Sequence, residues 1–424
     1  MTEAAAVPAR GDTAPPGATP DPDGPIPPES PAGDRADFLD EVCGLLWPPP
    51  ASAVRARAGA GDLLVVPSLR DPRLLIPARR RAGAAAVRRY GEPGSARARL
   101  GRRALGLALA SGAGPVLLRD RLRIRVPAGA PTLETYLSGQ LGGEVLLSMH
   151  LGAARANRKP VLQLLTPAGR TVAFAKVGIT PLTSRLVSDE HAALDQVQAG
   201  GLTTVQAPQV LHLGRWQDLD VLILSALPVW RARRPLADGQ LAAAMAEVAG
   251  LAAGPPEPLA GGRYLRGLAG RLAAAPASAD RAVLEAELAE LNREHGRHEL
   301  ALGAWHGDWT PWNMAVTADG LLLWDWERFA TGVPAGFDAL HYQLQSEVVT
   351  AHADPAPAAA GLPGRAPELL APLGVGPVQA RLTALLYLAE LSARYLADRQ
   401  AEAGARLGAP GQWLIPALTS ARAA

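Results

Sequence analysis

The sequence predicts an α+β protein, because strand-like and helix-like segments are grouped along the chain instead of alternating. Residues 131–228 contain short alternating apolar segments that indicate antiparallel strands, whereas residues 229–424 show mostly the longer periodicity of helices. The chain has 424 residues, of which 48% are hydrophobic and 19% charged, enough for sizeable cores in two or three domains. We therefore expect a strand-rich lobe followed by a helical lobe.

Two further segments precede the strand-rich lobe. Residues 1–34 are rich in Pro, Gly, Asp and Ala, a composition typical of a disordered tail. Residues 35–130 predict an N-terminal α/β extension: two short strands in "DLLVVPSLRDPRLLIPA", Arg/Ala-rich helices near 79–90 and 95–110, and a strand in "VLLRDRLRIRVP". The sequence assigns no role to this extension.

The elements of the two lobes follow from their periodicity. The segments "GEVLLSMHLG", "KPVLQLLTPAGRTVAFAKVG" and "VLHLGRWQDLDVLILSAL" predict strands, the last two as hairpins, with one helix over 183–199 between the hairpins. In the helical segment we expect helices near 238–252, 279–296 and 378–402 and a short strand "GLLLWDW". Several Pro and Gly residues predict a loop over 353–377.

Composition excludes some classes of function. The net charge of +2 gives no reason to expect nucleic acid or membrane as a partner. A single cysteine, Cys43, rules out an internal disulfide framework and favours a reducing compartment. The N-terminus has neither the basic start nor the apolar core of a secretory signal, and the apolar runs are too short to span a bilayer. We expect a soluble, cytoplasmic protein, and the sequence leaves its oligomeric state open.

Lysine is rare enough to be informative. The chain has two lysines, Lys159 and Lys176, among 42 basic residues, so a retained lysine is a candidate for a place that needs a compact ammonium group. Lys176 lies on a predicted strand, and Glu190 lies on the apolar face of the helix that follows. A carboxylate facing a core is costly unless a cation meets it. Such a pair holds nucleotide phosphates in kinase-like lobes; the alternative is an ordinary surface ion pair.

A second group of polar residues lies in "AWHGDWTPWNMAVTADGLLLWDWERF", residues 304–329, among five of the nine tryptophans. Asp308 and Asn313 are five residues apart, and Asp325 follows twelve residues later at the end of an apolar strand. Phosphoryl transfer needs a carboxylate that accepts the proton of the attacking hydroxyl, and oxygen ligands that hold Mg²⁺ against the phosphates. Asp308 suits the first role, and Asn313 and Asp325 suit the second.

These motifs carry a family resemblance. "HGDWTPWN" followed by "LLLWDWE" resembles the signature of the aminoglycoside phosphotransferase and choline kinase-like family, and the similarity extends over about residues 140–345. The resemblance implies a small-molecule kinase that uses ATP and Mg²⁺. It also implies a protein-kinase-like bilobal fold, in which an antiparallel-sheet small lobe with one helix occupies residues 131–228 and a mostly helical large lobe occupies residues 229–424.

The resemblance also implies roles for single residues. Asp308 would be the catalytic base, with His306 bracing its loop, and Asn313 and Asp325 would bind Mg²⁺. Lys176 would contact the α- and β-phosphates while Glu190 holds it. The remaining nucleotide-binding candidates are the hinge after "DVLIL", with Ser225 and Leu227, and Asn157 and Lys159 in the phosphate-covering loop. Lys159 either adds charge over the phosphates or caps a strand.

The phosphate-covering loop departs from the family pattern. Family members often carry several glycines or serines there, whereas "HLGAARANRKPVLQLL" has one glycine, Gly152. Fewer glycines restrict close approach of the backbone to phosphates. This feature favours an alternative hypothesis, a nucleotide-binding or inactive pseudokinase with a regulatory or scaffolding role, whose partner docks on the Arg-rich segment 79–103. A protein kinase-like activity is a weaker alternative, because no activation segment follows Asp325.

The acceptor is the least determined part of the predicted function. The family resemblance predicts a small molecule with a hydroxyl group, and aminoglycoside-, sugar- and amino-alcohol-like compounds all remain open. Trp309 and Trp312 flank the proposed base, where they either stack on the acceptor or pack inside the protein. Glu327 follows the proposed metal ligand and is expected to shape the acceptor pocket or to support the metal ligands.

Overall fold

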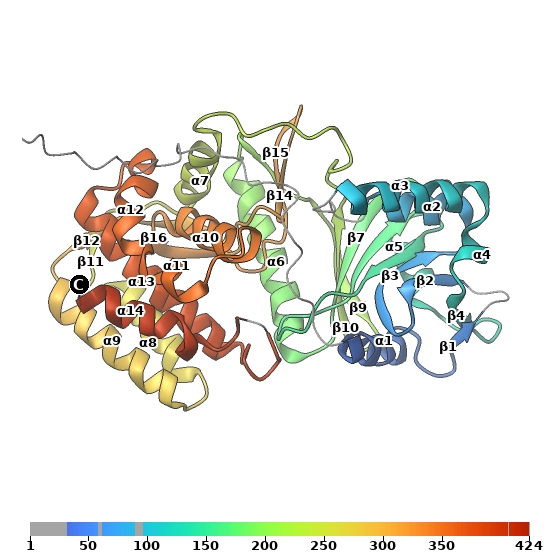
Figure 1. Ribbon diagram of the computed structural model, residues 1–424, viewed down its shortest axis with the longest axis horizontal. Helices are drawn as coiled ribbons and strands as arrows, with labels where there is room; N and C mark the ends of the chain where they lie inside the picture. The colour runs from blue at the N-terminus through green and yellow to red at the C-terminus, as the bar shows by residue number, and fades with distance from the viewer. Residues whose placement is uncertain (1–31, 58–61, 90–95, 406, 424) are drawn as a thin grey trace, which may run out of the picture.

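Two lobes of different construction lie side by side in the computed structural model, which describes residues 32–57, 62–89, 96–405 and 407–423 (Figure 1). The N-terminal lobe contains a large antiparallel sheet, and the C-terminal lobe is mostly helical. The predicted α+β fold is therefore confirmed. Most of the predicted tail lies outside the described residues.

One sheet of nine strands, in the order β1-β4-β2-β3-β5-β6-β7-β10-β9, runs through the whole N-terminal lobe. Every neighbouring pair in it is antiparallel. The strands are β1 (Ser52–Arg57), β2 (Leu63–Ser68), β3 (Asp71–Pro77), β4 (Asp120–Arg125), β5 (Leu146–His150), β6 (Val161–Leu165), β7 (Thr171–Gly178), β9 (Val210–Trp216) and β10 (Leu219–Ser225). Because β3 pairs with β5, the strands of the N-terminal extension continue the sheet of the small lobe.

Alternating side chains place apolar residues on both faces of this sheet. Leu63 and Val65 belong to one buried cluster, while Leu64 belongs to another on the opposite side, as the period of two in a strand requires. Helices α1 (Ala32–Leu46) and α5 (Leu133–Leu141) contribute to the first cluster, and α2 (Arg80–Arg89) and α3 (Ala96–Ser111) to the second. The first cluster includes residues from both the extension and the small lobe, so these segments share one core.

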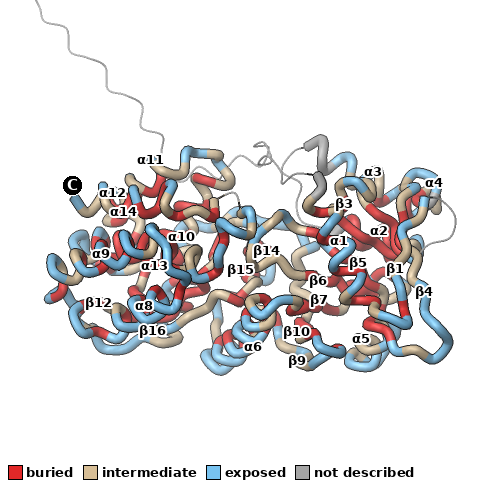
Figure 2. The backbone as a smooth tube through the Cα atoms, turned by 90° about the horizontal axis from the view of Figure 1, so that it is seen from below, coloured by how far each residue is buried: buried red, intermediate tan, exposed pale blue. Residues whose placement is uncertain are grey.

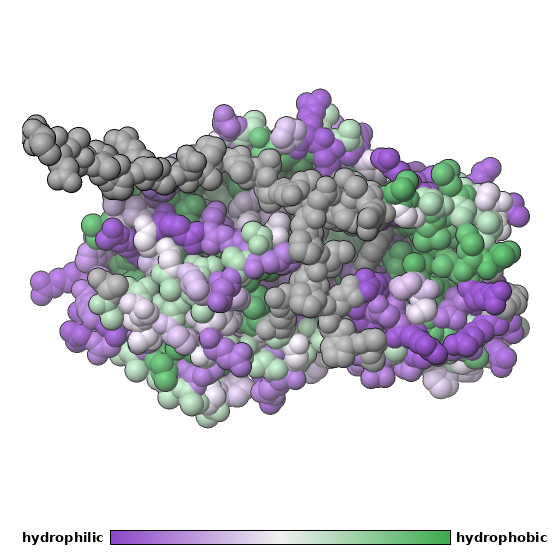
Figure 3. Space-filling view, in the orientation of Figure 1, coloured by the Kyte–Doolittle hydropathy of each residue, from purple (hydrophilic) through white to green (hydrophobic). Residues whose placement is uncertain are grey.

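Apolar side chains are also exposed at the end of this lobe. Figure 3 shows an apolar area over the region of α3 and α4 (Gly114–Leu117). Leu107, Val116 and Leu117 are among the exposed large apolar residues.

Helix α6 (Pro181–Gly200) lies between the lobes (Figure 1). It begins with a capping box, in which Thr180 accepts a hydrogen bond from the backbone N–H of Thr183, and Pro181 occupies the first helical position. It ends at Gly201, whose φ of 65° is the left-handed conformation favoured at helix C-termini. These boundaries place Glu190 in the middle of the helix, on its buried side.

The C-terminal lobe combines short strands with a helical core (Figure 2). β14 (Met314–Thr317) and β15 (Gly320–Leu323) form a hairpin beside β8 (Val205–Gln206), β13 (Leu302–Trp305) pairs with β16 (Ala330–Pro334), and β11 (Glu257–Pro258) pairs with β12 (Glu299–Leu300). The helices are α7 (Gln240–Gly250), α8 (Arg263–Ala274), α9 (Ala279–His295), α10 (Phe337–Gln345), α11 (Pro355–Ala360), α12 (Leu362–Leu370), α13 (Pro377–Ala397) and α14 (Leu414–Ala423). Helix α13 is buried along most of its length and forms the centre of this lobe.

The predicted loop over 353–377 was wrong, because α11 and α12 occupy most of it. Two of the prolines mark helix starts: Pro355 and Pro363 lie in the first turns, where the missing N–H has no intrahelical partner to lose, whereas Pro367 lies inside α12. Asp354 caps α11 by accepting a hydrogen bond from Ala356.

Among the described residues, no single helix has both the length and the apolar composition needed to cross a bilayer. One bent pair, Leu362–Leu373 with Pro377–Ala397, meets that test by length and composition alone.

Candidate active site

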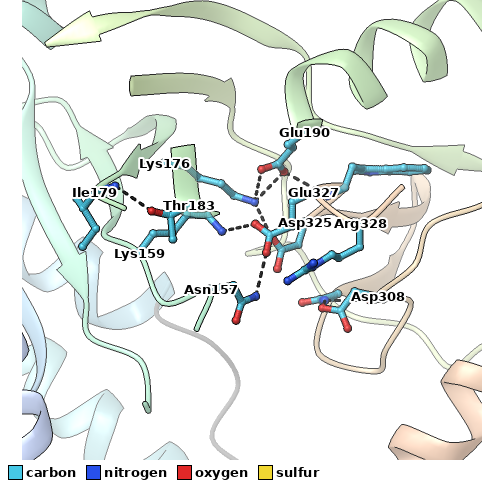
Figure 4. A network of polar contacts seen from close by, with 12 residues as sticks. Asn157, Lys159, Lys176, Ile179, Thr183, Glu190, Asp308, Asp325, Glu327 and Arg328 are labelled. Atoms are coloured by element: carbon cyan, nitrogen blue, oxygen red, sulfur yellow. Dashed lines mark hydrogen bonds and ion pairs between the residues drawn. The ribbon is translucent and has the colours of Figure 1, made fainter. Parts of the chain in front are cut away.

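Lys176, Glu190, Asp308 and Asp325 lie together between the two lobes, where β7 and α6 face the loop after β13 and the segment that follows β15 (Figure 4). The lobes contribute different chemistry. The small lobe supplies the lysines, an amide and the carboxylate of Glu190, whereas the large lobe supplies most of the carboxylates.

Lys176 on β7 forms the central ion pair of the site. Its Nζ lies 2.7 Å from Oε1 of Glu190, which is fully buried on α6. Lys176 also forms an ion pair with Asp325 of the large lobe. Burial lowers the pKa of Lys176, but the two carboxylates outweigh burial and raise its pKa above the ordinary value. Lys176 and Glu190 therefore form a buried ion pair within the small lobe, to which the surface ion-pair alternative does not apply, and Lys176 reaches the large lobe through Asp325.

Asp325 occupies an unusual backbone conformation directly after β15. Its φ of 72° lies in the left-handed region, which a non-glycine residue adopts only when its surroundings enforce it. The next residue, Trp326, is fully buried and donates its backbone N–H to Glu190 at 3.2 Å. Burial raises the pKa of Asp325, but the neighbouring Lys176 ammonium outweighs it and holds this pKa below its usual range. The strained turn thus directs an ionised carboxylate toward the small lobe.

The loop that carries Asp308 is held by its backbone. Asp338 on α10 accepts hydrogen bonds from the N–H groups of His306 at 2.7 Å and of Gly307 at 3.1 Å. Gly307 has a φ of 82°, and a Cβ at this position would lie 2.1 Å from the carbonyl oxygen of Arg328. Only glycine fits this position, so the loop geometry requires the glycine of "HGD".

The ring of His306 is hydrogen-bonded to the backbone at both of its nitrogens. Its Nδ1 accepts a hydrogen bond from the backbone N–H of Asp308 at 3.2 Å, so Nε2 carries the proton and donates to the carbonyl oxygen of Trp324 at 3.1 Å. Burial lowers the pKa of His306 to about 4, which keeps the ring neutral at pH 7. The neutral ring links the backbone at Asp308 to the residue preceding Asp325.

The side chain of Asp308 is held on both oxygens. Oδ2 accepts a hydrogen bond from Nδ2 of Asn313 at 2.9 Å, and Oδ1 lies 3.2 Å from Nε2 of His341. Nδ1 of His341 bonds to the hydroxyl group of Tyr387 at 2.9 Å. Burial, the largest single effect, raises the pKa of Asp308, but the hydrogen bond and charge of His341 together with the charge of Arg394 outweigh it, so this pKa lies below the ordinary value. Asp308 is therefore ionised at neutral pH.

Sequence reasoning missed His341 and Tyr387. His341 follows Asp338 by three residues on α10, so both side chains lie on one helix face and reach the same loop. This spacing in "GFDALH" is the signal that would have identified His341. Tyr387 lies on α13, far along the chain, and no local pattern indicates it.

The acidic groups fit a divalent cation. Carboxylate oxygens of Glu190, Asp325 and Glu327 all lie within 4.8 Å of one another. Three carboxylates against the two lysines, Lys159 and Lys176, leave an excess negative charge that a cation would neutralise. Oxygen donors of this kind suit Mg²⁺.

Asn313 is the other residue predicted to bind the metal. Its Nδ2 donates to Asp308, so the amide oxygen points elsewhere and is the atom that would bind a metal. The three clustered carboxylates include the predicted metal ligand Asp325. The other two, Glu190 and Glu327, were not predicted as metal ligands.

The phosphate-covering loop and the hinge complete the site. Nδ2 of Asn157 donates to Glu327 at 3.0 Å, and Lys159 forms an ion pair with the same carboxylate (Figure 4). At the end of β10, the N–H of Ser225 donates to the carbonyl oxygen of Gln209 at 2.8 Å, so this N–H is not free to bind a nucleotide base. The carbonyl oxygen of Leu227 accepts a hydrogen bond from Val229 at 2.8 Å.

The two tryptophans beside the base differ in burial. Trp309 is 0% exposed and packs against His306, with 6.0 Å between the ring centroids, whereas Trp312 is 43% exposed. Trp309 is thus a packing residue, and Trp312 is the ring that can contact a bound molecule.

A lysine held by a helical glutamate, opposite a loop that carries Asp and Asn, is the arrangement of kinase-like phosphotransferases. Residues 160–366 match the model of the phosphotransferase enzyme family, APH, which confirms the family resemblance over this segment. No curated protein sequence matches the chain.

The solved structures that match this chain include a phosphotransferase and a kinase. A thermostable mutant of aminoglycoside phosphotransferase APH(4)-Ia, in a ternary complex with ADP and hygromycin B, is 15% identical; the match covers 68% of this chain and 98% of that chain, with a TM-score of 0.44. Amicoumacin kinase hAmiN, in complex with AMP-PNP, Ca²⁺ and Ami, is 13% identical; the match covers 61% of this chain and 86% of that chain, with a TM-score of 0.38.

Proposed function

We propose that this protein transfers the γ-phosphoryl group of ATP to a hydroxyl group of a small molecule, with Mg²⁺ as the metal. The observation that carries the proposal is the convergence of two sets of residues on one place between the lobes. Lys176 with Glu190 comes from the small lobe, and Asp325 with the Asp308 loop comes from the large lobe. Because phosphoryl transfer depends mainly on positioning and charge, this convergence is the feature that the reaction requires.

The nucleotide would be held from the small lobe. Lys176 would contact the α- and β-phosphates and Glu190 would keep its ammonium in place. Asn157 and Lys159 would exchange Glu327 for phosphate oxygens. At the hinge, the backbone N–H of Leu227 would donate to the adenine base, while Ser225 would contribute its carbonyl oxygen.

Mg²⁺, when bound, supplies positive charge that stabilises the phosphate oxygens during transfer. Asp325 and Asn313 would hold it, as the family resemblance implies. Glu327 lies at the same place and would either bind the metal or adjust its position.

Asp308 would act as the base. The acceptor hydroxyl would donate its proton to this carboxylate, whose pKa lies below the ordinary value, so that it is ready to accept a hydrogen bond at neutral pH. His341 and Asn313 hold one carboxylate oxygen each and fix the direction of the remaining lone pairs. The exposed ring of Trp312 would contact the acceptor.

The test is a panel of hydroxyl-bearing metabolites, aminoglycosides and amino alcohols, scored for ADP formation that depends on acceptor and Mg²⁺. The parent protein is expected to phosphorylate a subset of these compounds. Parallel calorimetry with Mg-ATP measures nucleotide binding directly. Absence of both binding and transfer would exclude the proposed kinase function.

A pseudokinase remains the alternative function. The observations that favour it are the single glycine of the phosphate-covering loop and the pairing of both lysines with large-lobe acids, which nucleotide must displace. Binding of Mg-ATP without transfer to any acceptor would support this alternative.

A protein kinase activity is less favoured, because β16 follows Asp325 after only four residues and leaves no long activation segment. We propose a cytoplasmic location, which the single free and buried Cys43 supports.

His341 provides a prediction about pH dependence. Asp308 has a pKa below its usual value, partly because His341 donates to it, so the ionised form is favoured at neutral pH and lost as the pH falls through the folded-state pKa. In His341→Leu the donor is gone, and we expect the acid limb of the kcat/KM profile to move to higher pH. A hydrogen bond to a charged group contributes about 1.5–3 kcal/mol, so the acid limb should move by about one to two pH units.

His341→Gln is the matched variant, because its amide nitrogen can replace Nε2 as a donor. Its pH profile should lie closer to that of the parent than the profile of the leucine variant does. If the acid limbs of all three proteins coincide, His341 does not control the protonation of Asp308.

A further inference from the structure

The loop that covers the phosphate position needs support that its own sequence does not supply. Residues 151–160 connect β5 to β6 and contain one glycine, Gly152, so the backbone is not designed to wrap closely around phosphates. The loop nevertheless places Asn157 and Lys159 on Glu327 in the site. Other contacts must therefore fix its position.

Arg158, between these two residues, points instead to α1, which begins at Ala32, in the last residues of the predicted tail, and continues into the N-terminal extension. Its Nη1 lies 2.6 Å from Oδ2 of Asp34 and its Nη2 lies 3.0 Å from Oδ1, so the two side chains form a two-pronged ion pair. The guanidinium group also lies over the ring of Phe38, 4.0 Å from its centroid. Planar two-pronged pairing and stacking on an aromatic ring together fix the orientation of an arginine.

The helix that holds Arg158 is itself anchored. On α1, Arg35 forms an ion pair with Asp71 of β3 at 3.0 Å, and Phe38 is buried in the core that the extension shares with the small lobe. The first residue of the loop is tied to the same strand, since the N–H of Leu151 donates to the carbonyl oxygen of Arg73 at 2.9 Å. The extension therefore holds the loop both at its start and near its end.

We propose that the N-terminal extension positions the phosphate-covering loop through the contact of Arg158 with Asp34 and Phe38, here called the α1 clamp. This inference rests on the proposed function, because it takes nucleotide phosphates as the ligand of the loop. With Arg158 held on one side, Asn157 and Lys159 are presented on the other side before the nucleotide binds. The loop is then ordered before the nucleotide binds, so binding loses less conformational entropy than it would with a mobile loop.

The large lobe also contacts this loop away from Glu327, because Oε1 of Gln400 accepts a hydrogen bond from the backbone N–H of Ala156 at 3.2 Å. This bond lies outside the α1 clamp and would remain in variants of α1. The clamp therefore changes the population of the ordered loop and does not decide alone whether the loop is folded.

The experiment compares Asp34→Ala with Asp40→Ala in the full chain. Asp40 is on the same helix and pairs with Arg55 at 2.6 Å, away from the loop, so this variant matches the charge change without touching the clamp. Hydrogen exchange of the peptide covering residues 151–160 is measured first. We expect faster exchange in Asp34→Ala and exchange like that of the parent in Asp40→Ala.

Nucleotide binding is measured on the same proteins by calorimetry with Mg-ATP, and KM and kcat are measured on an acceptor from the panel. We expect the Kd and the KM for ATP to rise about tenfold in Asp34→Ala with kcat little changed, because the competent loop is less populated. The charge-reversed pair Asp34→Arg with Arg158→Asp should recover most of the affinity that either single reversal loses.

Two results would overturn the clamp: loop exchange in Asp34→Ala equal to that of the parent, or faster exchange with an unchanged Kd. An equal loss of affinity in Asp40→Ala would also overturn it, since the effect would then be a general one of charge on α1. If the parent itself does not bind Mg-ATP, the proposed function fails, and exchange alone then decides whether α1 orders the loop.

Discussion

Asp308→Asn is expected to lower kcat about 1,000-fold, while the KM for ATP stays within about twofold, because a general base contributes about 10²- to 10⁴-fold and does not hold the nucleotide. The asparagine keeps the shape of the side chain and loses the ability to take a proton. Its amide oxygen can still accept from Asn313. His341 can adopt the other tautomer and accept from the new amide nitrogen, with its Nδ1–H donating to Tyr387. The loop should therefore keep its structure.

The measurement is steady-state transfer to an acceptor found in the panel, together with Mg-ATP calorimetry. Asp319→Asn is the matched control, because Asp319 carries the same charge, lies in the β14–β15 turn and pairs with Arg231 away from the base. The control should keep the kcat of the parent. A kcat for Asp308→Asn within about tenfold of the parent value would remove Asp308 from the role of base.

The site residues that could be predicted from the sequence are those that a local sequence pattern indicates. Asp308, Asn313 and Asp325 occur within one short stretch, so their spacing alone indicated phosphoryl transfer. Lys176 and Glu190 were predicted because a strand period and a helix period each put a charge on an apolar face. His341 and Tyr387 escaped, because they meet Asp308 only through the packing of α10 and α13.

The fold shows the same division between local and distant signals. The hairpin of β2 and β3 and the helix α6 follow from local periodicity and turn residues. The joining of the extension to the small lobe depends on the pairing of β3 with β5, between segments separated by α2, α3 and β4. Such pairing is set by the complete core and not by either strand, so the sequence could not show that the two segments share one sheet.

A second large loss is expected at Asp325. Asp325→Asn should lower kcat about 100- to 1,000-fold at a fixed low Mg²⁺ concentration, because the carboxylate charge opposite the metal position is removed. Asparagine tolerates the left-handed φ of 72°, so the turn after β15 should persist. Lys176 keeps Glu190 as its partner. Activity as a function of Mg²⁺ concentration is the measurement, and part of the lost rate should return at high Mg²⁺.

Measurements of stability distinguish the effect of the Asp325 charge from the effect of its backbone conformation. The pKa of this group in the folded protein lies below the ordinary value, so its contribution to stability is complete at neutral pH and is lost as the pH falls below about 4, the value for an unfolded Asp. Asp325→Asn should therefore unfold at lower urea concentration than the parent by the same margin at pH 7 and pH 5. Asp325→Ala should be less stable than Asp325→Asn by about 1–2 kcal/mol, because alanine pays the cost of the left-handed conformation. An unchanged Mg²⁺ dependence in both variants would show that Asp325 does not bind the metal.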